Sequence, residues 1–295
     1  MQFIKFRIYL PLLFLITILQ YQIVLSQEFA IYKSLENDSL QFSSKRAMIS
    51  GGLLLSCVGV ITLTIDEAYY QDHRVKFHFA KDAKGDLTWF DNYHRGMDKF
   101  GHMFSTSLFS QNIYFLSHWS GYSNKTSSML GSSISIGLLG AMEVWDAHFE
   151  SWGFSVGDFI SNVAGGIYPV IQYNYKPLQN IDYKMSYNFL KEKSPDHSIH
   201  DYEHMTFWLT INPRGFSNSK FIRWFPSWLN IAAGISLDSY QNQEQEFYIG
   251  LDYNLKRIKT DSLILNQLIA FIDRFHLPAP AIRISPSTVY YGFFF

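Results

Sequence analysis

The chain has 295 residues, with 24 Lys and Arg against 25 Asp and Glu, and its formal net charge is −1. This even balance excludes the basic surface typical of nucleic-acid-binding proteins, and the length allows one large domain or two of ordinary size. Charged residues make up 17% and aromatic residues 18% of the chain, a pairing that favours contact with lipid over a purely soluble aromatic-rich core.

Residues 1–26 predict a signal peptide. Two basic residues precede a mostly apolar stretch over 8–22, and the small residues Val24 and Ser26 predict cleavage before Gln27. An uncleaved anchor is the competing interpretation, because no charge follows within this segment. In both cases we expect an exported protein that is membrane-associated in the cell envelope.

Four apolar segments then predict a helical bundle domain over residues 27–175. Residues 47–65 are uncharged and long enough to cross a bilayer. A charged loop separates them from apolar segments over about 98–118, 127–149 and 156–173, which contain ionisable groups and are short for full spans. Buried helices of a bundle and helices lying partly in the membrane both fit these three segments.

The pattern changes in residues 176–295, which predict a β-rich C-terminal domain. Stretches rich in aromatic and β-branched residues alternate in polarity, as expected for antiparallel strands. The predicted strands cover 181–189, 205–212, 229–238, 246–255 and 289–295, with one helix over 262–275 and an extended segment over 277–281. A last strand that ends on Phe is typical of outer-membrane barrels, although four to six strands are too few to form one alone. We therefore predict an α+β fold in which a membrane-associated bundle of about four helices packs against this β-rich part, on the periplasmic side or at the outer membrane rather than the inner membrane.

Ionisable residues recur near one end of three of the apolar segments. Asp98 and His102 are four residues apart and share a helix face, and Glu143 and Asp146 do so at a spacing of three. An ionised carboxylate in apolar surroundings is costly unless it is paired, hydrogen-bonded or bound to a metal, so these groups are predicted to converge. The predicted polar cluster comprises Asp98, Lys99, His102, Glu143, Asp146, Ser155, Asp158 and Asn162.

This cluster has more than one interpretation. It could be a structural network in which Lys99 neutralises the acids. It could also hold a divalent metal, since one imidazole with several carboxylates suits a hard or borderline cation, although no diagnostic metal-binding spacing is present. The candidate metal ligands are His102, Glu143, Asp146 and Asp158. No Gly-rich phosphate loop or nucleophile elbow indicates another cofactor.

Three motifs in order carry a resemblance to a known family. They are MDKFGH at 97–102, EVWD at 143–146 and WGFSVGD at 152–158. They resemble the YfiM-like family of uncharacterised bacterial envelope proteins, often described as predicted periplasmic lipoproteins, in its longer Bacteroidetes-type form, and their order is similar to that of VanZ-like membrane proteins. The resemblance covers about residues 85–170 and implies an envelope location. The chain departs from the lipoprotein pattern because no Cys follows the signal segment.

Two functions stay open. The first is a non-enzymatic envelope protein whose cluster structures the bundle or binds an ion or a lipid headgroup, with membrane lipid and a second envelope protein as candidate partners. The alternative is a metal-assisted hydrolase or transferase that acts on a lipid-linked or cell-wall substrate. In that mechanism His102 would be the general base and Asp98 would orient it. Glu143, Asp146 and Asp158 would bind the metal or the substrate.

Overall fold

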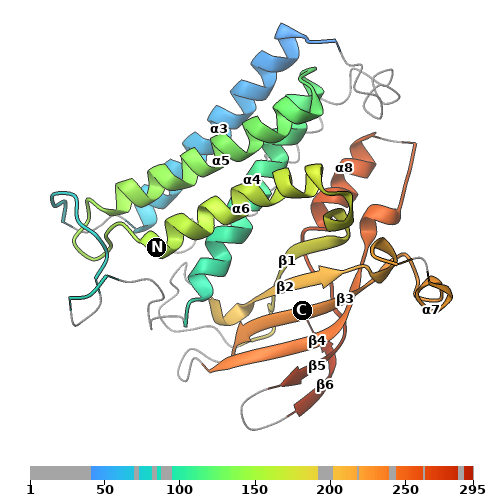
Figure 1. Ribbon diagram of the computed structural model, residues 1–295. Helices are drawn as coiled ribbons and strands as arrows, with labels where there is room; N and C mark the ends of the chain where they lie inside the picture. Colours follow the sequence, from blue (N-terminus) through green and yellow to red (C-terminus); the bar gives the residue numbers. More distant parts are fainter. Residues whose placement is uncertain are drawn as a thin grey trace.

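The computed structural model describes the chain in nine stretches and confirms the predicted α+β class. Helices come first, and a six-stranded antiparallel sheet with one further long helix follows (Figure 1). The predicted signal peptide over 1–26 lies outside the described residues. These are 41–69, 73–81, 85–87, 95–191, 202–217, 219–238, 244–261, 263–284 and 289–294.

Four helices are found in the described part of the N-terminal half. They are α3 (Ser44–Tyr69), α4 (Met97–Trp119), α5 (Asn124–Asp146) and α6 (Val156–Asn174). The last three pack against one another, and α3 lies against α4. Glycines allow this close approach: a Cβ added to Gly131 would lie 2.3 Å from the carbonyl oxygen of Ser110, and one added to Gly165 would lie 2.2 Å from that of Met103.

Helix α3 covers the predicted segment 47–65 and extends it at both ends. Within the described part of the chain it is the one helix long and apolar enough to cross a membrane, over Ser44–Thr62, and only 11% of that window is buried. This statement about α3 is based on the length and composition of the helix alone. The core helix of a soluble protein would also be long and apolar, but most of it would be buried.

The sheet has its strands in chain order, and each neighbouring pair is antiparallel. Pro280 lies in β5, the strand next to the sheet edge, within a segment predicted only as extended. Predicted and observed strand ends differ by one or two residues elsewhere, and α8 is shorter than predicted. The strands are β1 (Ile181–Tyr187), β2 (Met205–Ile211), β3 (Leu229–Leu237), β4 (Gln245–Tyr253), β5 (Ala279–Ile284) and β6 (Val289–Phe294). The other helices are η2 (Lys176–Asn180), η3 (Tyr202–His204), η4 (Pro213–Gly215), α7 (Lys220–Arg223), η5 (Leu255–Arg257) and α8 (Leu263–Ile272).

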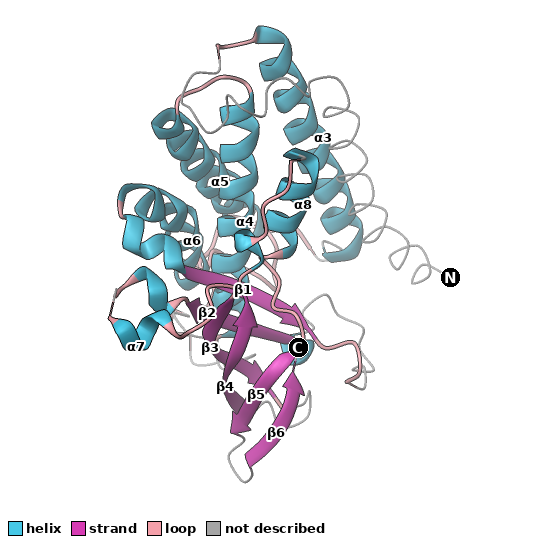
Figure 2. Ribbon diagram, turned by 90° about the vertical axis from the view of Figure 1, so that its right-hand side faces the viewer, coloured by secondary structure: helices cyan, strands magenta, loops and turns pink. Residues whose placement is uncertain are grey.

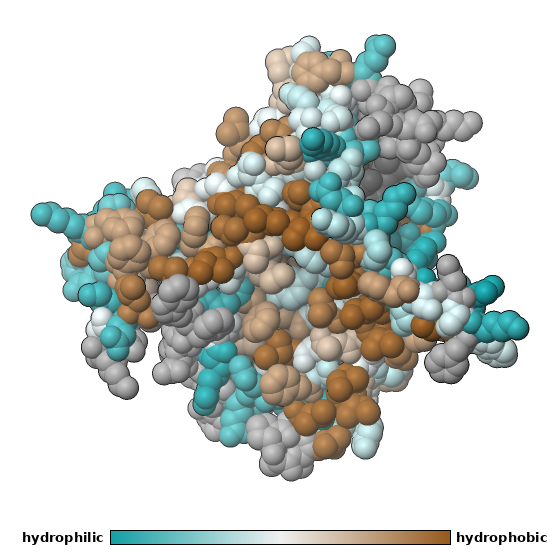
Figure 3. Space-filling model, viewed as in Figure 1, coloured by the Kyte–Doolittle hydropathy of each residue, from teal (hydrophilic) through white to brown (hydrophobic). Residues whose placement is uncertain are grey.

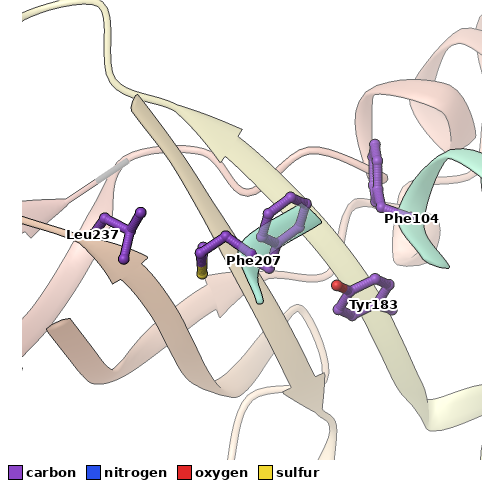
Figure 4. Packing of buried hydrophobic residues seen from close by; sticks show 5 residues of the cluster. Phe104, Tyr183, Phe207 and Leu237 are labelled. Carbon is purple, nitrogen blue, oxygen red and sulfur yellow. The ribbon is translucent and has the colours of Figure 1, made fainter. Parts of the chain in front are cut away.

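The bundle and the sheet meet where α4 crosses β1 and β2. Phe104 of α4 packs against Tyr183 and Phe207, with ring centroids 6.2 and 6.5 Å apart (Figure 4). The hydroxyl of Tyr183 also donates a hydrogen bond to the carbonyl oxygen of Phe100 at 3.0 Å. Figure 2 shows the result, with the helices on one side of this contact and the sheet on the other. The first turns of α4 are therefore fixed against the sheet.

Candidate functional site

Three helix ends meet in the bundle and carry the ionisable residues that the sequence singles out. The first turn of α4 supplies Asp98 and Lys99, and His102 follows one turn later. Glu143 lies near the end of α5, and Asp158 lies in the first turn of α6. Because consecutive helices of a bundle run in opposite directions, the start of α4, the end of α5 and the start of α6 come together.

Lys99 is the centre of a buried ion-pair network. Its Nζ lies 2.5 Å from Oδ2 of Asp98 and 2.9 Å from Oδ1 of Asp158. Burial alone would lower the pKa of the Lys99 ammonium, but the two carboxylates raise that pKa above its ordinary value, so Lys99 stays charged. The hydroxyl of Ser155 accepts a hydrogen bond from the backbone N–H of Asp158 at 3.2 Å. This N-cap fixes the start of α6 beside Lys99.

A second group of polar side chains joins the same three helices. Nδ2 of Asn162 donates to Oε1 of Glu143 at 3.4 Å, and Oδ1 of Asn162 accepts from the hydroxyl of Thr106 at 2.8 Å. Nδ1 of His102 lies 3.2 Å from Oδ1 of Asn162 and 3.4 Å from Oε1 of Glu143. Burial, and then the charge of Asp158, raises the pKa of Glu143 to about 9. Without a bound cation, this carboxyl group is therefore protonated at neutral pH.

His102, Glu143 and Asp158 lie close enough to share one ligand. Each of them offers one atom that can ligate a metal, an imidazole nitrogen or a carboxylate oxygen, and these three atoms lie within 4.8 Å of one another. The side chain of Glu143 is 2% exposed and that of Asp158 is 11% exposed, whereas His102 is 24% exposed. The site is thus closed on the side of α5 and more open at His102. One imidazole and two carboxylates suit a hard or borderline divalent cation.

Of the four predicted metal ligands, Asp146 is the one that the structure does not bring into this group of three. It ends α5, one turn beyond Glu143, and its side chain is half-buried. Its charge still contributes to the raised pKa of Glu143. Residues three apart in a helix share a broad face but differ in height by about 4.5 Å, which is enough to leave one of them outside a compact site. The other predicted cluster residues are joined by the contacts described above.

Thr106 is a member of the network that sequence reasoning missed. It is fully buried, and its hydroxyl lies 2.8 Å from both Oδ1 of Asn162 and the carbonyl oxygen of His102. The signal was present, because Thr106 follows His102 by four residues and therefore shares its helix face. A threonine in an apolar segment is easily taken for a neutral core residue, since its hydroxyl can bond within its own helix.

Comparison with known proteins finds one family model, which covers the part of the chain that contains this cluster. Residues 86–174 match the model of a family described as "Predicted periplasmic lipoprotein (DUF2279)", and this range includes α4, α5 and α6 with the whole predicted cluster. The match fits an uncharacterised, exported, envelope-associated protein. The YfiM-like and VanZ-like relationships stay predictions. No curated protein and no solved structure matches the chain.

Proposed function

We propose that this envelope protein binds a divalent cation in its helical bundle, with His102, Glu143 and Asp158 as ligands and no reaction attached to the binding. The observation that carries the proposal is the approach of one donor atom from each residue to within 4.8 Å of the others. Each ligand comes from a different helix, so a bound ion would join α4, α5 and α6 at their meeting point.

The surroundings of the three residues suit a cation site. Nε2 of His102 faces Oδ1 of Asp158 at 3.8 Å, while Nδ1 lies near the Asn162 amide oxygen. Metal-binding histidines usually keep one nitrogen for the ion and use the other for such a partner. Glu143 is buried, and its polar neighbours are the Asn162 amide at 3.4 Å and the His102 imidazole at 3.4 Å. Binding would displace its proton, so we expect affinity to increase with pH.

A structural network is the second candidate, and a specific observation favours it. Lys99 already places a positive charge 2.9 Å from Oδ1 of Asp158 and 2.5 Å from Asp98. In this alternative Lys99 serves as the cation, Glu143 stays protonated, and the cluster only holds the helices in register. The two candidates differ in whether an added metal ion stabilises the protein.

The test uses the full chain, purified in detergent and freed of metal by a chelator. Zn²⁺, Mn²⁺, Mg²⁺ and Ca²⁺ are each titrated, with bound metal and melting temperature as the two readouts. Glu143→Gln removes one ligand but keeps the shape of the protonated side chain, so the variant should fold. Asp146→Asn is the matched control, because it neutralises an acid on the same helix outside the group of three.

We expect at least one of the ions to bind to the wild type with a stoichiometry of one. At a hundredfold excess over Kd this would stabilise the fold by about 2.7 kcal/mol. Glu143→Gln should lose this effect, and Asp146→Asn should keep it. A wild type that binds none of the four ions, together with a Glu143→Gln variant of equal stability, would leave the structural network as the better explanation.

A further inference from the structure

The C-terminal sheet has an exposed face made of apolar side chains. Along β2 to β6, alternate residues point to this face, and large apolar members are between 36% and 79% exposed. They are Leu209, Ile211, Ile231, Phe247, Ile249, Ile282, Ile284, Val289, Tyr291 and Phe293, which we call the outer face. Figure 3 shows apolar side chains gathered over the sheet and, in the same view, over α6.

Strand pairing makes the outer face continuous. Leu209 of β2 is opposite Ala233, which is opposite Ile249 of β4. Ile249 is opposite Ile282, which is opposite Tyr291 of β6. Residues directly opposite in antiparallel strands share a face, so this row crosses five strands without a charged side chain. A second row passes through Phe247, Ile284 and Val289, and at its other end it reaches Phe207, which is buried against α4.

The opposite face of the sheet is buried, and many polar side chains lie there around a small apolar cluster of Trp208, Ala232, Tyr248 and Ala281. Lys184 of β1 is 0% exposed, and its Nζ lies 2.8 Å from Asp252 and 3.1 Å from Asp273. Glu246 of β4 is 3% exposed and accepts a hydrogen bond from the hydroxyl of Tyr248 at 2.8 Å. Other buried polar residues of this face are Asp182, Ser186, Thr206, Thr210, Asn230 and Ser236.

This arrangement is the reverse of what water favours. A one-sided sheet in water buries its apolar residues and exposes its polar ones, because burial of apolar surface is the main favourable term in folding. Here ionisable residues are enclosed in pairs while isoleucine, leucine and phenylalanine face outward. We infer that the outer face contacts the acyl chains of a phospholipid bilayer, where this distribution is the favourable one.

The rim of the outer face supports lipid rather than a protein partner. The segment between β2 and β3, residues 213–228, contains three basic and no acidic residues. Lys220 and Arg223 of α7 are exposed there, and Trp224 and Trp228 are 89% and 54% exposed. Basic side chains next to an apolar surface complement anionic phospholipid headgroups, and tryptophan favours the headgroup level.

The central strands are long enough to reach across a bilayer, whereas the outer strands are shorter. β3 and β4 each have nine residues, which corresponds to about 30 Å of extended chain, while β5 and β6 have six residues each. The inference does not depend on a cation in the bundle, because none of the proposed ligands lies in the sheet. It assigns the sheet, rather than α3 alone, to the membrane.

The test places a fluorophore on the outer face. In a Cys57→Ser background, which removes the single native cysteine, Ile249→Cys is labelled with an environment-sensitive dye. Glu244→Cys is the matched control, since Glu244 is exposed and precedes the outer-face residues of the same strand. The full chain is reconstituted into vesicles of phosphatidylethanolamine and phosphatidylglycerol. Quenching is measured with nitroxide on the lipid acyl chain and with iodide in the water.

We expect lipid nitroxide to quench the Ile249 dye several-fold more than the Glu244 dye, and iodide to show the opposite order. Because both dyes are attached to the sheet region, the comparison reports on the sheet itself and does not depend on whether α3 enters the bilayer. Iodide quenching of the two dyes to the same degree would overturn the inference. Protection of the Ile249 dye from both quenchers, or oxidation of unlabelled Ile249→Cys to a disulfide-linked dimer, would also overturn it in favour of a protein partner. Leu209→Cys replaces Ile249→Cys if the latter does not fold.

Discussion

Replacement of Lys99 by methionine should destabilise the bundle strongly. Lys99 is 4% exposed, and Lys99→Met keeps most of its volume but removes the charge between Asp98 and Asp158. The side chain of Asp158 is 11% exposed and would lose its cation. Removal of one partner of a buried ion pair costs about 3–5 kcal/mol, because an uncompensated charge stays buried. For a protein of this size we expect the melting temperature to fall by roughly 6–20 °C.

The assay is thermal or denaturant unfolding of the full chain in detergent with a chelator present. The control is the double variant Lys99→Met/Asp158→Asn, in which the more buried of the two orphaned carboxylates is also neutralised. It should recover a large part of the stability that Lys99→Met loses, since residues in one ion-pair network do not act additively. The reasoning is refuted if Lys99→Met costs less than about 1 kcal/mol. It is equally refuted if the two substitutions simply add.

Three further substitutions test the packing of the bundle and the pH response of the sheet. Gly165→Ala would place a Cβ 2.2 Å from the carbonyl oxygen of Met103, so we expect a loss of about 1–3 kcal/mol in unfolding experiments. Gly137→Ala meets nothing within 4 Å and should stabilise α5 by about 0.5–1 kcal/mol. Burial lowers the pKa of His276 from 6.5 to about 4, so its stabilisation is present above pH 6.5 and is lost as the pH falls toward 4. His276→Phe should reduce this acid sensitivity by up to about 3 kcal/mol.

Each of these expectations has a result that contradicts it. Equal stability of Gly165→Ala and Gly137→Ala would show that α4 and α6 do not approach as closely as the structure has them. A wild type and a His276→Phe variant whose stabilities change in parallel between pH 6.5 and 4 would show that the imidazole is not held neutral by burial. Both comparisons use the difference between two proteins, so titration of other carboxyl groups cancels to first order.

Much of the polar cluster in the bundle could be predicted from the sequence, because the spacing of residues along a helix determines which of them share a face. Asp98 and His102 share a face by spacing alone, and the Ser155 cap follows from its position before Asp158. The convergence of three helix ends follows from the cost of unpaired charge in apolar segments. The spacing of residues does not determine how far along the bundle axis each side chain lies. For this reason the sequence predicts Asp146 as a metal ligand, although the structure leaves Asp146 outside the group of three.

The sheet shows a different limit of sequence reasoning. Alternation of polar and apolar residues predicts the strands, but the same alternation fits either face being buried. Lys184, Asp252 and Asp273 belong to segments far apart in the chain, and each looks like a solvated residue in its own segment. The pairing of strands β1 to β4 and the return of the chain after α8 bring both carboxylates to within 3.1 Å of Nζ of Lys184. Their burial is a property of the tertiary fold.

Both halves of the described chain enclose a buried ion pair and leave large apolar side chains exposed. Lys99 with Asp158 in the bundle and Lys184 with Asp252 in the sheet have nearly the same separation, 2.9 and 2.8 Å. In water such burial would lose the solvation of the charges and leave the apolar surface unfavourably hydrated. Against hydrocarbon the comparison reverses, because an exposed charge would have no solvent at all. The buried ion pairs and the exposed apolar side chains therefore support the proposed contact of the sheet with lipid.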